Sequence, residues 1–196
     1  GVGPDGALPV EPPALEYTID AGTAPNVAAA TRLVAAGRAR MAARDYGAAL
    51  DQLARAIAID PGNPYAYYYL AELHFVHRTY DQAIAFADSL VSQQMHHGYW
   101  RIGYGSAWLA DMGAALGIFQ ALEPHADSTR MRRYEAAAAR FVQAMVRDDM
   151  IAKSGAIGFG QPVDDTGVVR AWRSDVGWGD DPYLISTALV GIELQA

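Results

Sequence analysis

The sequence predicts an all-α fold in which antiparallel helix pairs stack into a solenoid. The pentapeptide DYGAA at residues 45–49 recurs 34 residues later as TYDQA at residues 79–83. A fixed period of this length is typical of stacked helical units. Small residues keep the same register, since Gly37 is matched by Ala71. Small side chains at matching places let two helices approach closely, so the repeat predicts packed pairs.

Four helices are expected in the repeated region, residues 26–95. They cover residues 26–43, 47–59, 64–77 and 81–94. The first unit ends in the segment DPGN at residues 60–63, because a Pro-Gly pair stops a helix.

A third helix pair is expected in residues 96–147, where the repeat becomes weaker. Ser106 is a suitable N-cap for a helix that reaches about Leu122. The next helix is expected from Ser128 to Arg147, because its apolar residues recur at three-to-four spacing. These residues are Tyr134, Ala138, Phe141, Val142 and Met145.

The two repeated units, about residues 30–63 and 64–94, resemble the tetratricopeptide repeat (TPR), an antiparallel helix pair that stacks into a superhelix. The resemblance covers a third of the chain and implies a protein that holds partners rather than reacting with them. In this family the first helix of each unit lines a concave groove. The groove positions it implies are Val34, Arg38 and Met41 in the first unit and Tyr68, Glu72 and Phe75 in the second.

Such a groove suits an apolar segment or an extended peptide. Family members that grip acidic peptide tails use Lys, Asn and Arg on these faces, whereas Tyr68 and Glu72 stand there in this chain. A clamp of that kind is therefore not expected. The groove is expected instead to hold the N-terminal arm of this chain or of a neighbour.

That arm, residues 1–25, is expected to be extended, because frequent prolines exclude a helix. Its apolar residues alternate with a period of two. They are Leu8, Val10, Leu15, Tyr17 and Ile19. The pattern fits an arm lying across its own solenoid as well as one inserted into a neighbouring subunit.

The C-terminal part is expected to be irregular before it ends in a helix. Residues 148–180 are rich in glycine, and a short β-hairpin can join about 156–161 to 168–173. Asp181 and Pro182 then begin a terminal helix, residues 181–196. Its apolar surface must be buried in its own core or against another chain. The residues that form this surface include Leu184, Ile185, Leu189 and Ile192. Residues 25–196 are expected to form one structural unit.

Charge and composition exclude several kinds of function. The net charge of -7 argues against nucleic acid or an anionic membrane surface as the main partner. The absence of cysteine excludes thiol catalysis, thiolate metal sites and disulfides. There is no run of about eighteen apolar residues, so no membrane span is expected. The chain begins with Gly1, which suits a mature secreted protein; a cytoplasmic location stays open.

No catalytic residue, metal ligand or cofactor is predicted. His74 and His77 are one turn apart, but no metalloprotease-type pattern surrounds them, so a structural role is favoured. Asp180 and Asp181 lie near tryptophans, as acids do in glycan-processing clefts. Turn and capping roles explain such acids without catalysis.

The favoured function is a secreted, self-assembling scaffold. Each unit buries its surface only against neighbours, so the ends of the stack are expected to expose apolar faces. Contact between unlike ends gives a homo-oligomer or a helical filament. The alternatives are a glycan-binding or carbohydrate-active module that uses Asp180 or Asp181, and a monomeric adaptor for an apolar peptide.

Overall fold

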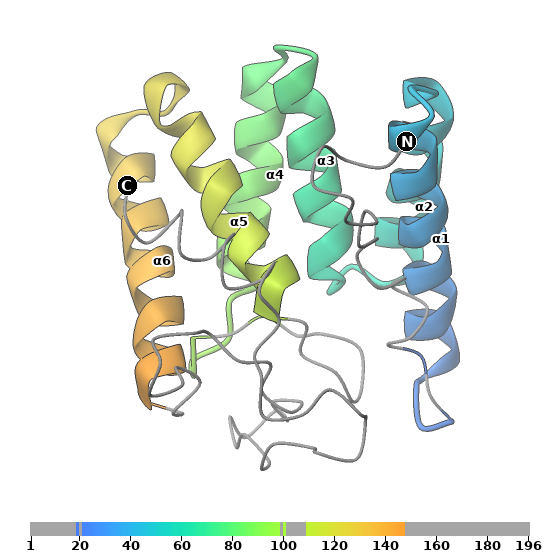
Figure 1. Cartoon of the computed structure of the whole chain (residues 1–196), viewed down its shortest axis with the longest axis horizontal. Coiled ribbons are helices and arrows are strands. Elements are labelled where there is room, and N and C mark those ends of the chain that lie inside the picture. The colour runs from blue at the N-terminus through green and yellow to red at the C-terminus, as the bar shows by residue number, and fades with distance from the viewer. Residues whose placement is uncertain (1–18, 20, 99, 101–108, 148–196) are drawn as a thin grey trace, which may run out of the picture.

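The structure is a computed structural model that describes residues 19, 21–98, 100 and 109–147 (Figure 1). Three helix pairs stand in a row, with α1/α2 at the right of Figure 1, α3/α4 in the centre and α5/α6 at the left. A 3₁₀ turn, η2, separates α5 from α6. The bounds are Pro25–Ala42 for α1, Tyr46–Ile59 for α2, Pro64–Val76 for α3, Tyr80–Ser92 for α4, Leu109–Leu122 for α5, Glu123–His125 for η2 and Ser128–Arg147 for α6.

The predicted helices are confirmed, and their ends differ from the expected ones by only a few residues. Among the described residues the sole extended pairing is an isolated antiparallel bridge between Gln94 and Trp100. The proposed N-cap Ser106, the β-hairpin, the terminal helix and the arm up to residue 18 all lie outside the described residues. Of the arm's apolar residues, only Ile19 is described, and it is half-buried.

The first helices of both repeats end in the same way. Arg44 and Arg78, 34 residues apart, each have a φ of 59°. In both turns the amides of the arginine and of the next residue donate to carbonyls three and five residues earlier, at 2.9 Å. These bonds form a Schellman motif, in which glycine usually occupies the left-handed position. The repeat is therefore preserved in the backbone even where the side chains are costly.

Small residues bring the paired helices together, as the sequence predicted. A methyl group added to Gly37 would lie 2.8 Å from Cγ of Leu53, which is fully buried on α2. The matching Ala71 and Ala83 of the second unit also have no exposed surface. The close crossing of the two helices thus depends on side chains of minimal size.

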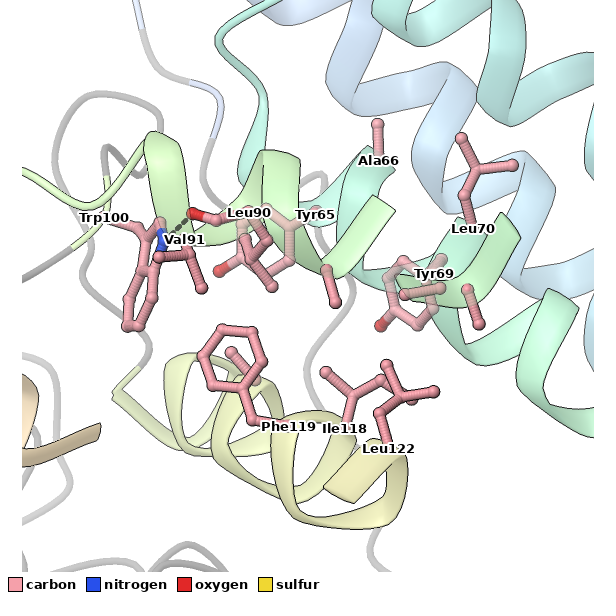
Figure 2. Close-up of a cluster of buried hydrophobic side chains, with 14 of the residues drawn as sticks. Tyr65, Ala66, Tyr69, Leu70, Leu90, Val91, Trp100, Ile118, Phe119 and Leu122 are labelled. Carbon is pink, nitrogen blue, oxygen red and sulfur yellow. Dashed lines mark hydrogen bonds between the residues drawn. The ribbon is translucent and has the colours of Figure 1, made fainter. Parts of the chain in front are cut away.

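The segment after α4 joins the third pair to the second. The indole of Trp100, 2% exposed, donates to the Leu90 carbonyl at 2.6 Å and packs between Phe119 and Phe141 (Figure 2). The Gln94 amide nitrogen donates at 2.8 Å to two carbonyls, one in this segment and one on α6. The sequence pattern gave no sign of this anchor, since the 34-residue repeat weakens here.

Polar groups also hold α4 against α6. Asp88 accepts a hydrogen bond from Nε of Arg130 at 2.9 Å and from the Tyr134 hydroxyl at 3.3 Å. Burial, and then the negative charge of Asp88, raise the pKa of Tyr134. The phenol therefore stays protonated and serves as a donor. Tyr134 and Phe141 are buried on the apolar face predicted for α6.

One end of the stack differs from the expectation of apolar ends. On α3, Ala66 and Leu70 are buried and point toward the first pair in Figure 2. The positions 34 residues earlier on α1 are Arg32 and Ala36, and both are exposed. Terminal units of repeat proteins commonly carry such a polar outer face, because no further unit covers them.

Candidate functional site

The groove positions implied by the repeat fall on α1 and α3, which contact each other. Arg38 and Met41 on α1 and Tyr68, Glu72 and Phe75 on α3 are half-buried, so each keeps surface for a partner. Val34 differs, since its side chain has no exposed surface and belongs to the core. It supports this face from beneath and offers no contact to a partner. We call the other five residues the α1/α3 face.

A polar group lies in the middle of the α1/α3 face. The Glu72 side chain is half-buried, and burial is the main cause that raises its pKa. A hydrogen bond from Tyr68 and the positive charge of Arg38 oppose this rise without overcoming it. The predicted groove residues of two repeats therefore interact with one another.

Aromatic rings close one end of the α1/α3 face. Phe75 meets the Tyr80 ring edge-on, with centroids 5.7 Å apart. His125, from η2, stacks on Tyr80 at 3.6 Å with the ring planes within 10° of each other. Phe75 also packs against the core. A partner would thus meet a rigid aromatic surface here and charged groups one turn away.

The repeated tyrosines have equivalent partners in successive units. Tyr46, at the start of α2, packs edge-on against His77, just after α3, at 4.4 Å. Tyr80, at the start of α4, stacks on His125, just after α5. The histidines are residues 77 and 125, so they do not share the 34-residue register. Sequence periodicity could not reveal this relation between units.

His74 has the structural surroundings that the sequence favoured. Its Nδ1 lies 2.8 Å from the Thr79 hydroxyl, and its ring stacks on Phe86 of α4 at 5.4 Å. Burial, and then the charge of His77, lower the pKa of His74. In the part of the chain that the structure describes, no three His, Asp or Glu side chains gather as a metal site. Asp180 and Asp181 lie outside that part.

The geometry defines an α-solenoid built from antiparallel helix pairs. The sequence model of the tetratricopeptide repeat family matches residues 40–102. This segment is therefore a TPR region, and repeats of this kind indicate an interaction scaffold for other proteins. No curated protein matches the chain. Among the described helices, none is long and apolar enough to cross a membrane.

Proposed function

We propose that this chain is a non-enzymatic scaffold that holds an extended polypeptide segment on the α1/α3 face. Met41 and Phe75 offer apolar contacts on neighbouring helices, and both pack on the core, which fixes their positions. Ligand surfaces commonly combine such apolar groups with a few fixed polar ones. Here Arg38 and Glu72 supply the polar contacts.

The observation that carries this proposal is the Glu72 carboxylate. Its raised pKa means that the folded protein holds the charged form less favourably than the unfolded chain does. Folding alone gives no reason for such a group on a partly exposed face, because glutamine has the same size and no charge. A partner that donates hydrogen bonds to the carboxylate gives one, so we assign Glu72 to partner recognition.

For the partner itself we propose another copy of the chain, in a homo-oligomer or a filament. The apolar alternation of the arm and the apolar surface expected for residues 181–196 support this proposal. The polar outer side of α1 does not favour direct apolar stacking at that end, so the arm is the proposed link between copies. Secretion stays a prediction from the sequence, and fractionation of the source cells into medium and cytoplasm tests it.

Peptide selection tests the α1/α3 face directly. Peptides enriched from a phage-displayed random library are measured against the full chain by fluorescence anisotropy. We expect Phe75→Ala and Arg38→Ala each to weaken binding about tenfold, which corresponds to about 1.4 kcal/mol. Leu50→Ala, at an exposed site on α2, is the matched control and should bind as wild type does. Equal binding by all variants would contradict the assignment of this face.

Self-association is tested separately by sedimentation velocity at micromolar protein. The proposal requires species larger than the 21.0 kDa monomer. A single 21.0 kDa species over the whole concentration range would overturn it.

A further inference from the structure

The outer side of α1 carries a row of exposed side chains that the repeat family does not account for. Arg32, Ala36 and Arg40 follow one another at intervals of four residues and are all exposed, so they share one side of the helix. Arg44, in the turn after α1, is exposed as well. We call these four residues the α1 end face. The equivalent side of α3 packs on the first pair, so the α1 end face occupies the place where a preceding unit would bind.

This face is basic in an acidic protein. Residues 25–59 contain five arginines and two aspartates, a net charge of +3, whereas the whole chain carries -7. One of the aspartates, Asp45, pairs with Arg40 at 3.2 Å. Both side chains of that pair are about half exposed, so the pair contributes little and can exchange partners. The end face therefore attracts carboxylates.

The arm has the complementary charge. Residues 1–24 contain Asp5, Glu11, Glu16 and Asp20 and no lysine or arginine, so their net charge is -4. In an extended chain Glu16 and Asp20 lie on the same side, about 13 Å apart. Arg32 and Arg40 are about 12 Å apart along α1, from the rise of a helix. Two carboxylates can thus meet two guanidinium groups, with Thr18 opposite Ala36.

We propose that the α1 end face binds the acidic arm of a second copy of this chain. The inference rests on the proposed self-association and names the surface that receives the arm. Within a single chain the end face keeps its exposure, so it is available to a neighbour. Because the arm and the end face are different surfaces, the contact is heterologous and extends into rings or rows of subunits.

Charge reversal in the full chain tests the inference by sedimentation velocity. The face variant is R32E/R40E/R44E, and the arm variant is E11K/E16K/D20K. Each alone should lose self-association by tenfold or more, because like charges then face each other. An equimolar mixture should associate again, since the acidic arm of one variant meets the basic face of the other and the reversed pair also matches. Raising the salt from 0.05 to 0.5 M should weaken wild-type association about tenfold.

A matched control separates the end face from total charge. R55E/R78E/R132E makes the same change in net charge at exposed arginines elsewhere and should associate as wild type does. Circular dichroism confirms that each variant is folded. If wild type associates and the face variant does so equally, this inference is wrong while the proposed self-association stands. A monomeric wild type overturns both. If the mixture does not associate, the arm does not bind between copies, and the inference fails.

Discussion

The first and second units share one backbone but differ in what surrounds them. Both first helices end in a left-handed arginine with the same hydrogen bonds, and both pairs cross at small residues. The outer positions diverge: Leu70 on α3 is 1% exposed, whereas Ala36 at the matching place on α1 is open to solvent. The difference teaches that position in the stack, rather than the helix itself, decides what a side chain must be.

Exchanging the two outer residues should have the largest and most unequal effect. Leu70→Ala removes a buried side chain and should lower the free energy of unfolding by about 2–5 kcal/mol. Ala36→Leu adds a side chain in solvent and should change it by less than about 0.5 kcal/mol. Urea denaturation followed by circular dichroism measures both. A large loss in Ala36→Leu would mean that the outer side of α1 is covered.

Adding one methyl group at the crossing of the first pair should have the next largest effect. Gly37→Ala forces Leu53 to move, because the new Cβ would lie 2.8 Å from its Cγ. We expect a loss of about 1–3 kcal/mol from overpacking. Gly47→Ala is the control: that position has open space around it, so the variant should gain up to about 1 kcal/mol from helix propensity. Equal melting temperatures for the two variants would contradict the close crossing.

Relieving the left-handed arginine should stabilise both units by a smaller, similar amount. Arg78→Gly should raise the free energy of unfolding by about 0.5–1 kcal/mol, because glycine adopts a φ of 59° without strain. Arg44→Gly should do the same if the two turns are equivalent. Arg78→Ala separates the effect of φ from that of the lost side chain, and it should give no gain. Thermal unfolding in a calorimeter measures these changes.

The smallest effect concerns Glu72, which has no acidic counterpart on α1, where Arg38 occupies the matching position. Its pKa is raised in the folded protein, so the folded state binds a proton more readily than the unfolded chain does. Wild type should therefore lose stability relative to Glu72→Gln as pH rises from the ordinary carboxyl range through the raised pKa. Above that pH the difference should stay constant.

Denaturation of both proteins from pH 4 to pH 8 tests this sign. A Glu72→Gln variant that is less stable than wild type at pH 7 would show that Arg38 and Tyr68 outweigh burial. In that case the carboxylate stabilises the fold, and its assignment to partner recognition loses its support.

Much of the fold was predictable from the sequence because its causes are local. The 34-residue register, the Pro-Gly stop at residues 61–62 and the apolar spacing of α6 act over a few turns of chain. The family resemblance then located five half-exposed groove residues. It misplaced Val34, because the exposure of a side chain depends on how close the next helix lies.

The sequence by itself determined the helices, their pairing and the register between the first two units. Tertiary structure alone decided which histidine each repeated tyrosine contacts, how Trp100 and Gln94 attach the third pair, and that the outer side of α1 is polar. The physical reason is distance along the chain. Helix formation and capping depend on neighbouring residues, whereas these contacts join segments whose separation does not follow the repeat, so packing alone selects them.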